Sequence, residues 1–308
     1  MPIRNEASYL AQAVASIQNQ QLPEGWKSEL VVALAQSEDS SAEILSAIQR
    51  EAEAGWLRVI ENPAGDTAGG LNLAIAAAIG EVIIRVDGHS VLPANYASTG
   101  IRILLADASI ANTGGMMVAI GGNSLQSAIA WAYGSHWGLG GGKFHVGGEA
   151  GEVDTVYLGI FRADALREVG SFDVQFVRGQ DWELNQRLRA AGYRIWFDPR
   201  LQVEYRPRNS LGALRRQFYD TGRWRGVLTR GERGQSQLRY FAPPVLVLSS
   251  LLALPALLYL GVICAVALSA KVDGPTKAKL ILVLPTMHYS WGLGFLSGWI
   301  ASQAPKPQ

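Results

Sequence analysis

The chain has 308 residues and a net charge of +1, from 27 basic and 26 acidic side chains. This length allows one large domain and a smaller part. The near-neutral balance argues against a nucleic-acid partner, which would favour a strongly basic surface. The single cysteine, Cys264, excludes a disulfide framework and a cysteine metal site.

The first 86 residues alternate short apolar runs with amphipathic segments. Residues 1–6 have the pattern of a turn, and Asn5 can cap a helix in which Leu10, Val14 and Ile17 share one face. Further helices are marked by Ile44–Ile48 and 70–79, and strands are expected over 30–34, 57–60 and 82–86. This alternation predicts an α/β fold with a mostly parallel sheet and flanking helices.

After residue 90 the pattern is looser but still mixed. Asp181 opens a helix in which Leu184 and Leu188 point inward and which ends at Gly192. The other expected helices are 93–106, 162–169 and 211–228, and the other expected strands are 111–120, 154–161 and 195–197.

The run Glu81–Val86 ends abruptly at Asp87, Gly88 and His89. Its β-branched apolar residues predict a short buried strand, with Asp87 where the strand meets its loop. Ligands of open α/β sheets bind at the carboxyl ends of the parallel strands. Asp87 and His89 could therefore turn toward one cation and its bound diphosphate. A plain turn after a buried strand is the alternative.

Residues 243–268 form an apolar run without a charge that is long enough to cross a bilayer. Pro255 should kink this segment, and Leu280–Ile300 is a second, weaker span. With the short link over 271–279, these spans predict membrane-crossing C-terminal helices arranged as a hairpin. A buried pair of core helices is the alternative.

Arginines are concentrated between Arg206 and Arg239, directly before the apolar run. By the positive-inside rule they place the large domain on the cytoplasmic side of the cell membrane. We therefore expect a large domain over 1–239, followed by a membrane-anchoring hairpin and tail over 240–308.

Four short motifs follow one another along residues 1 to 230. They are Pro2-Ile3-Arg4-Asn5-Glu6, Asp87-Gly88-His89, Gln180-Asp181-Trp182-Glu183-Leu184, and Gln217 with Arg223-Trp224. Their order and spacing resemble the inverting family 2 glycosyltransferases of the GT-A fold. In that family the corresponding motifs are the Pro-x-x-Asn-Glu that ends the first strand, the Asp-x-Asp metal motif, the acidic motif of the catalytic base, and the Gln-x-x-Arg-Trp of polysaccharide synthases, which has a shorter gap.

A narrower resemblance is to the succinoglycan-type exopolysaccharide glucosyltransferases. It rests on Arg85-Val86-Asp87-Gly88-His89 at the metal site, on Asp154–Gly159 and on Tyr205-Arg206-Pro207-Arg208. The apolar C-terminal tail is similar as well.

The resemblance implies transfer of a hexose from a nucleotide-diphospho-sugar donor, with UDP as the first candidate, to a glycan or polyprenyl-linked acceptor. A divalent cation, Mn²⁺ or Mg²⁺, would neutralise the diphosphate and would be held by Asp87 and His89. Asp181 would be the catalytic base that takes the proton of the acceptor hydroxyl. The implied substrate-binding residues are Asn5, Glu6, Asp39, Asp87, Asp154, Gln217, Arg223 and Trp224.

Two features depart from the family pattern. The family's first strand should precede Pro2, where no strand is expected here, and Ala35 stands where the family usually has an aspartate that reads the nucleobase. Asp39, Glu6 or backbone groups would then recognise the base. These departures leave a second hypothesis open, a catalytically inactive relative that serves as a scaffold in a glycan-synthesis complex.

Structural roles are the alternative for several of these residues. Asp181 could be a plain helix N-cap, and Asp154 could have a structural role. Arg223 could hold the donor pyrophosphate, with Trp224 stacking nearby, or both could belong to a basic helix that touches lipid headgroups.

Overall fold

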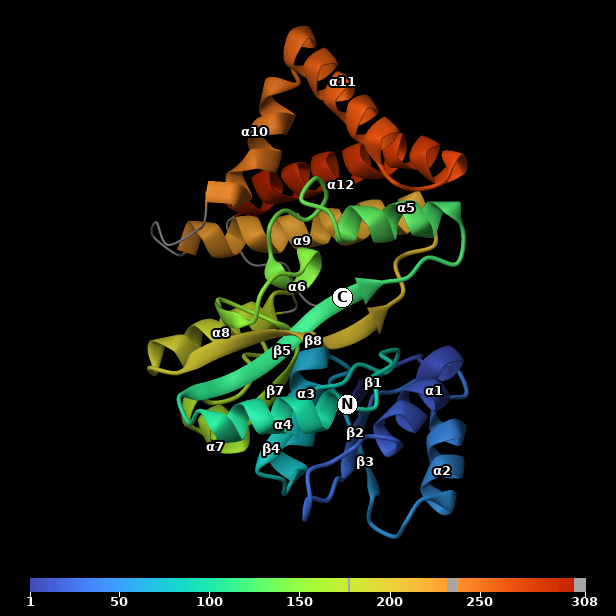
Figure 1. Cartoon of the computed structure of the whole chain (residues 1–308), viewed down its shortest axis with the longest axis vertical. Helices are drawn as coiled ribbons and strands as arrows, with labels where there is room; N and C mark the ends of the chain where they lie inside the picture. The colour runs from blue at the N-terminus through green and yellow to red at the C-terminus, as the bar shows by residue number, and fades with distance from the viewer. Residues whose placement is uncertain (177, 232–237, 302–308) are drawn as a thin grey trace. The chain divides into compact units, whose positions relative to one another are not determined.

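The computed structural model describes residues 1–176, 178–231 and 238–301 (Figure 1). The chain divides into two compact units, each built from two separate segments. The first unit contains Met1–Val118 and Gly147–Tyr205, and the second contains Ala119–Val146 and Arg206–Gln308. The compact units divide at other positions and do not test the functional boundary expected at residue 239. That boundary stays a prediction.

The N-terminal sheet of the first unit has three parallel strands. Their order is β1 (Pro2–Ile3), β2 (Leu30–Leu34) and β3 (Leu57–Glu61). The helices that follow these strands are α1 (Ala7–Gln18), α2 (Ser41–Glu51) and α3 (Thr67–Ala77). Helices α1 and α2 contact each other, whereas α3 packs on β1 and β2. All these elements except β1 lie where the sequence pattern predicts them.

The turn expected at the start of the chain, in place of a first strand, is wrong for Pro2 and Ile3. These two residues pair in parallel with β2. The carbonyls of Met1 and Ile3 accept hydrogen bonds of 2.9 Å from the N–H groups of Ala33 and Ala35. A strand of two residues is too short to show an alternation of buried and exposed side chains. It is recognised only by its pairing with β2.

The second sheet has five strands, in the order β4 (Val82–Ile84), β7 (Tyr157–Arg162), β5 (Ile110–Ala119), β8 (Arg194–Tyr205) and β6 (Gly151–Val153). Strand β7 pairs antiparallel with β4 and β5, and β6 pairs antiparallel with β8. The α/β class with a parallel sheet and flanking helices is confirmed. Of the strand pairs named here, only those of the N-terminal sheet are parallel. Side-chain periodicity predicts strands and not the direction of their partners.

Three further helices complete the first unit, namely α4 (Tyr96–Ala106), α7 (Ala163–Val169) and α8 (Gln180–Ala190). All three lie where helices are expected, and α7 ends at Gly170, whose φ of 86° is left-handed. Strand β8 extends beyond the expected 195–197, because Pro199 interrupts the apolar pattern without ending the strand. One apolar core joins both sheets and includes Leu10, Val32, Tyr96, Ile160 and Leu201.

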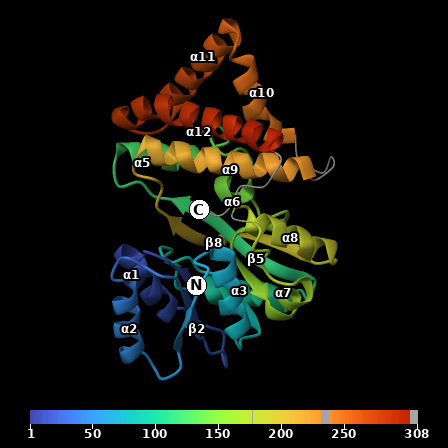
Figure 2. The same ribbon diagram turned by 180° about the vertical axis from the view of Figure 1, so that it is seen from behind.

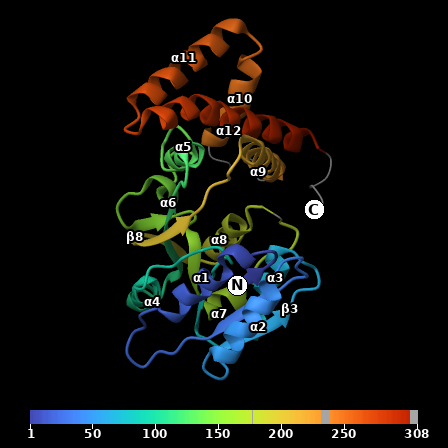
Figure 3. The same cartoon turned by 90° about the vertical axis from the view of Figure 1, so that its right-hand side faces the viewer.

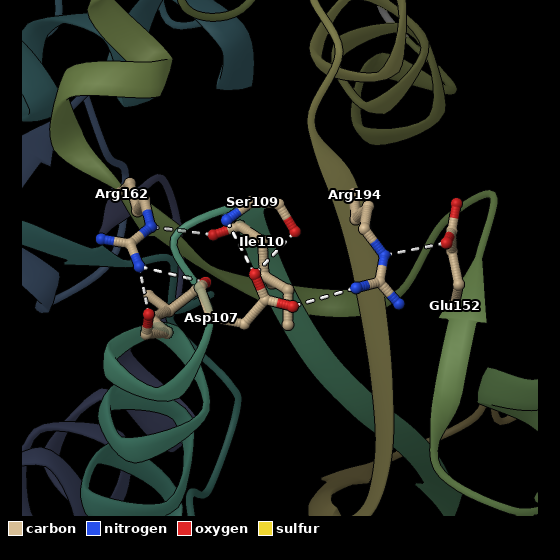
Figure 4. Close-up of polar contacts among 7 residues, drawn as sticks. Asp107, Ser109, Ile110, Glu152, Arg162 and Arg194 are labelled. Carbon is tan, nitrogen blue, oxygen red and sulfur yellow. Dashed lines mark hydrogen bonds and ion pairs between the residues drawn. The ribbon is translucent and has the colours of Figure 1, made fainter.

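Two arginines tie the loop between α4 and β5 to the neighbouring strands (Figure 4). Arg162 donates hydrogen bonds of 2.9 Å and 3.2 Å to the carbonyls of Ile110 and Asp107, and a further one to the last turn of α4. Arg194 forms ion pairs of 2.9 Å with the carboxylates of Asp107 and Glu152. These bonds satisfy carbonyls at the end of α4 and give this cluster a structural role.

The regular secondary structure described in the second unit is helical, apart from Ala119 at the end of β5. It contains α5 (Ser124–Tyr133), α6 (Lys143–Val146), α9 (Leu211–Gly231), a 3-10 turn (Leu238–Phe241), α10 (Ala242–Ser249), α11 (Ala253–Ser269) and α12 (Gly274–Ile300). Helix α12 packs against α5, α9, α10 and α11, and Figures 2 and 3 show α9 lying against it. The unit is therefore assembled around α12.

Glycines bring the backbones of α9 and α12 into direct contact. A β-carbon at Gly222 or Gly226 of α9 would overlap the backbone of α12, and one at Gly294 or Gly298 of α12 would overlap the backbone of α9. Each helix thus carries a Gly-x-x-x-Gly pair on the face that meets the other helix. This spacing is present in the sequence, but it becomes informative only when the partner helix is known.

The membrane hairpin expected over 240–300 takes a different form. The span expected over 243–268 is interrupted at Ser250–Leu252 and yields α10 and α11, of 8 and 17 residues. Pro255 lies in the first turn of α11, where its missing N–H is tolerated, so the chain breaks before this residue instead of kinking at it. Among the described helices, only α12 is long and apolar enough to span a membrane, and 44% of its most apolar window is buried.

Gly294→Ala should destabilise the second unit, because the added methyl group would overlap the carbonyl of Tyr219. Overpacking of this kind lowers the free energy of unfolding by about 1–3 kcal/mol. Thermal unfolding of the detergent-solubilised chain measures the loss.

Gly261→Ala is the matched control for this variant. Gly261 lies inside α11, and no neighbouring group comes within 4 Å of an added β-carbon. Replacing this helix glycine should raise stability by about 0.5–1 kcal/mol. Equal effects of the two substitutions would contradict a backbone contact between α9 and α12.

Candidate active site

The loop after β4 carries the expected metal motif, Asp87-Gly88-His89. Gly88 packs against the start of the chain, because a β-carbon at this position would lie 2.9 Å from Glu6 Cγ and would also meet Ile3. A side chain at Gly88 would have to push these groups away. The glycine therefore allows the loop that carries Asp87 and His89 to lie directly against the β1–α1 connection.

A buried arginine joins two of the predicted motifs. Arg85 is 9% exposed, and its guanidinium bonds Asp87 Oδ1 through Nη2 at 3.1 Å and through Nε at 3.3 Å. Its Nη1 donates to Oδ1 of Asp181, 96 residues further along the chain. The guanidinium carbon also lies 5.9 Å from the centre of the Phe172 ring. One cation thus brings the carboxylates of both motifs to one place.

The sequence prediction gave Arg85 no role in the site. A usable signal was present, because an arginine at the end of a buried apolar run must find carboxylate partners when it is withdrawn from water. Asp87, two residues later, is one obvious partner. The second partner, Asp181, follows only from the folded structure.

Opposing effects set the charge states of this cluster. Burial alone would raise the pKa of the Asp87 carboxyl, but the Arg85 guanidinium and His89 outweigh it and hold that pKa below its ordinary value. Burial acts to lower the pKa of Arg85, and the carboxylates of Asp181 and Asp87 raise it instead. At neutral pH, Arg85 is therefore a cation and Asp87 is an anion.

Helix α8 carries Asp181 in its first turn. The N-cap of α8 is Gly179, with a left-handed φ of 76°, so the alternative of Asp181 as a plain N-cap is wrong. The side chain of Asp181 is 40% exposed and stays accessible to solvent. Leu184 and Leu188 are fully buried, as expected, and orient the helix on the core.

A buried amide chain fixes α8 further. Asn185 accepts a 2.8 Å hydrogen bond from Asn112 of β5 and donates one of 2.9 Å to Thr155. These bonds lock the position of α8 and, with it, of the carboxylate one turn earlier. Glu183, the neighbouring acidic residue, forms a 2.5 Å ion pair with Arg187 on its own helix.

Glu6 lies beside the metal motif. Its Oε1 is 2.9 Å from Nδ1 of His89, and the two side chains are 23% and 36% exposed. In metal sites, a carboxylate on one ring nitrogen of a histidine orients the ring for coordination through the other nitrogen. The structure therefore adds an orienting role to the substrate-binding role predicted for Glu6.

Asn5 and Asp39 shape the loops beside Glu6. Asn5 has a left-handed φ of 56° and accepts a 2.8 Å hydrogen bond from the β2–α2 loop. For this reason the N-cap of α1 is Glu6, and not Asn5 as expected. Asp39 accepts hydrogen bonds from Ala7 N and from the hydroxyl and N–H of Ser41, at 2.6–3.0 Å, and these bonds hold its pKa below the ordinary value. Their substrate roles stay predictions.

The other predicted substrate-binding residues belong to different elements. Asp154 is half-buried in the loop between β6 and β7. Gln217, Arg223 and Trp224 lie on α9 in the second unit, where Gln217 accepts a 3.1 Å hydrogen bond from Arg208. The indole of Trp224 is buried, which favours a packing role over an exposed stacking surface. Substrate roles for these four residues stay predictions.

The residues of the loop suit a divalent cation that binds together with a diphosphate. Asp87 offers a hard carboxylate oxygen, and His89 offers a ring nitrogen. Across residues 1–176, 178–231 and 238–301, no group of three or more His, Cys, Asp or Glu side chains could hold a metal alone. Mg²⁺ sites of this kind take their remaining ligands from water and substrate phosphates.

Sequence comparison finds a matching family and related proteins. A family model described as glycosyl transferase family 2 matches residues 1–168. The succinoglycan biosynthesis protein ExoA of Rhizobium meliloti (strain 1021) is 28% identical, over 96% of this chain and 92% of its own length. A dolichyl N-acetyl-alpha-D-glucosaminyl phosphate 3-beta-D-2,3-diacetamido-2,3-dideoxy-beta-D-glucuronosyltransferase of Methanococcus voltae is 22% identical, with 97% and 96% covered.

Solved structures share the fold. The mannosyltransferase PcManGT from Pyrobaculum calidifontis, in complex with GDP-Man and Mn²⁺, superposes with a TM-score of 0.65 at 17% identity, over 98% of this chain and 86% of that one. TarS 1–349 of S. aureus, in complex with UDP-GlcNAc, has a TM-score of 0.53 at 15% identity, over 92% and 70%.

The fold and the family match define a glycosyltransferase of the GT-A class. The resemblance inferred from the four motifs is confirmed at this level. The chain belongs to glycosyl transferase family 2, whose model covers more than half of its length.

Arg85→Met should destabilise the first unit by about 3 kcal/mol at neutral pH, because the carboxylates lose their buried cation. In the natural chain the depressed pKa of Asp87 contributes stability above about pH 4, which is lost on acidification. In the variant, the Asp87 carboxylate lacks its cationic partner, so burial raises its pKa. Protonation then removes the cost of an unpaired buried charge. The stability difference should therefore shrink between pH 7 and pH 4.

Urea unfolding at several pH values measures this difference. Arg85→Lys is the control, because it keeps the positive charge but cannot bond two carboxylates with one planar group. It should fall between the natural chain and Arg85→Met. A difference that does not change with pH would show that Arg85 acts through packing alone.

Proposed function

We propose that the chain is a membrane-associated, inverting glycosyltransferase. It would move a hexose from a nucleotide-diphospho-sugar to a glycan or polyprenyl-linked acceptor in cell-surface or exopolysaccharide synthesis. The observation that carries this proposal is the cluster in which Arg85 binds both Asp87 and Asp181. The carboxylate of the metal site and the catalytic base must be positioned around the same donor sugar. Arg85, the common partner of Asp87 and Asp181, supports a single shared site.

On the donor side, Asp87 and His89 are the residues that would hold Mn²⁺ or Mg²⁺. Such a cation, when bound, neutralises the charge of the diphosphate leaving group. Arg85 keeps Asp87 ionised, and Glu6 orients His89. The structures of PcManGT with GDP-Man and Mn²⁺ and of TarS with UDP-GlcNAc support a donor of this class, and UDP is the first nucleotide to test.

On the acceptor side, Asp181 is proposed to take the proton of the attacking hydroxyl. The hydroxyl oxygen forms a bond to the anomeric carbon while the bond from that carbon to the diphosphate oxygen breaks. Attack from the face opposite the diphosphate inverts the configuration of the sugar. The Asp181 side chain is 40% exposed and is therefore accessible to an acceptor. Arg85 holds its Oδ1 atom in place.

Membrane association is supported by the second unit. Helices α10 and α11 carry no charged residue, and α12 is long and apolar enough to span a bilayer. The M. voltae relative is named for a dolichyl-phosphate-linked sugar, and an acceptor of that kind resides in a membrane. The arginines between 206 and 239 support a cytoplasmic position for the catalytic unit.

A donor screen tests the proposal. The purified chain is reconstituted in vesicles with polyprenyl-linked saccharides and is given UDP-glucose, UDP-N-acetylglucosamine or GDP-mannose with Mn²⁺ or Mg²⁺. Metal-dependent release of one nucleotide, with growth of the saccharide, is the expected result. Binding of a nucleotide-sugar without turnover, for every donor and acceptor, would support the inactive scaffold instead.

Asp87→Asn should lower turnover by orders of magnitude, because it removes the anionic ligand of the cation and its diphosphate. Nucleotide binding measured by calorimetry should lose most of its dependence on Mn²⁺. Chelation of metal by EDTA should reduce the natural enzyme to the level of the variant. Full turnover of the natural enzyme in EDTA would rule out this role.

The substitution Asp181→Asn preserves the shape of the side chain but replaces the basic carboxylate with an amide that cannot accept the proton. General-base catalysis contributes roughly 10²–10⁴-fold, so kcat should fall by about that factor. Donor binding should barely change, since the base touches the acceptor and not the diphosphate.

Glu183→Gln is the control for the base. Glu183 pairs with Arg187 within α8 and not with Arg85, so its loss should cost less turnover than the loss of Asp181. If Asp181→Asn retains near-normal turnover while Glu183→Gln abolishes it, the base has been assigned to the wrong carboxylate.

A further inference from the structure

Helices α10 and α11 expose an unusually large apolar surface. No charged residue occurs between Ala242 and Ala270. Seven leucines of this segment are 54–82% exposed, namely Leu248, Leu251, Leu252, Leu254, Leu257, Leu258 and Leu268. A contiguous apolar surface of this kind is costly in water and marks an interaction site.

The two helices are too short to cross a bilayer. Helix α10 would span about 12 Å and α11 about 26 Å, against a hydrocarbon core of about 30 Å. Together they form a hairpin whose tip is the break at Ser250–Leu252. Figure 1 shows α10, α11 and α12 as the three sides of a triangle, with α12 as the base.

Both ends of this hairpin are attached to α12. At the start of α10, the ring of Phe241 lies 5.7 Å from that of Phe295 and 6.1 Å from that of Trp299. At the end of α11, the carbonyl of Leu268 accepts a 2.8 Å hydrogen bond from Lys277 Nζ. The tip therefore lies between the two attachments.

The backbone donors of the tip are satisfied within the protein. The N–H groups of Ser250, Leu251 and Leu252 donate to carbonyls of α10 at 3.0–3.3 Å. The hydroxyl of Ser250 lies 2.7 Å from that of Tyr289 on α12. A non-helical turn is tolerated in hydrocarbon only when its polar groups are satisfied in this way.

Helix α12 is long enough to cross a membrane, but its other side is occupied by α9. The contact extends from Gly222, which meets Trp291, to Arg230, which bonds the carbonyls of Trp299 and Ala301. Helix α9 carries five arginines and one aspartate. If α12 crossed the bilayer, these arginines would enter the hydrocarbon with it, at a high cost.

We propose that the second unit is a monotopic anchor that enters one leaflet of an anionic phospholipid bilayer and does not span it. The tip Ser250–Leu252 inserts among the acyl chains, and α12 lies in the plane of the headgroups. The exposed Arg215 and Arg216 of α9 and the exposed Lys271 and Lys279 face lipid phosphates. This replaces the spanning hairpin expected from the sequence and deepens the membrane association of the proposed function, on which it rests.

Cysteine accessibility separates a monotopic anchor from a spanning hairpin. The full chain with Cys264→Ser, which removes its exposed native thiol, is reconstituted in vesicles of phosphatidylglycerol and phosphatidylethanolamine. Single variants Glu24→Cys, Lys271→Cys and Leu251→Cys are then treated with a membrane-impermeant maleimide before and after detergent. Glu24 is an exposed residue of the first unit and reports the side of that unit.

The monotopic anchor predicts that Lys271→Cys is labelled from the same side as Glu24→Cys. It also predicts that Leu251→Cys is labelled only after detergent is added. A spanning hairpin would put Lys271→Cys on the opposite side, and this result would overturn the proposal. Labelling of Leu251→Cys without detergent, or failure of the chain to bind protein-free vesicles, would overturn it as well.

Activity is measured separately, so that the two proposals can fail independently. Donor turnover by the same variants in detergent tests the glycosyltransferase assignment without a bilayer. Turnover with the wrong labelling pattern rejects the anchor alone, and the expected labelling without turnover rejects the catalytic proposal alone.

Discussion

A guanidinium withdrawn from water needs negative partners, and this requirement connects the chemically important parts of the first unit. Arg85 takes one partner from its own loop and the other from α8. Because Asn185 and two buried leucines fix α8, the carboxylate of Asp181 has little freedom to leave. The five-stranded sheet and α8, which packs on β8, therefore share one electrostatic constraint, and this constraint sets the geometry of the site.

Much of this fold follows from local patterns in the sequence. Strand β2 and the buried face of α1 have the period that their burial requires, and Gly170 ends α7 through its left-handed backbone. In contrast, β1 and the antiparallel partners of β7 depend on strands far away in the chain. Periodicity reports how a segment is buried, and it contains little information about which segment covers it.

The candidate site shows the same division. The motifs that carry Asp87 and Asp181 are recognisable in the sequence, and the structure brings both to Arg85. The pairing of Glu6 with His89 is not visible in sequence, because it depends on Gly88 allowing two loops to touch. The length and the lack of charge of the apolar segment after residue 240 predict spanning helices. Its form depends on a break before Pro255 and on glycines of α9 that meet α12.

The long stretch of chain between α5 and α12 sets the order in which the two units can be assembled during synthesis. Helix α5 ends at Tyr133, whereas its partner α12 is complete only at Ile300. At ordinary translation speeds the ribosome needs roughly ten to thirty seconds for the intervening stretch. During that interval the first unit can fold around its own core, while α5 and α9 wait for their common partner. The second unit consequently matures after the first.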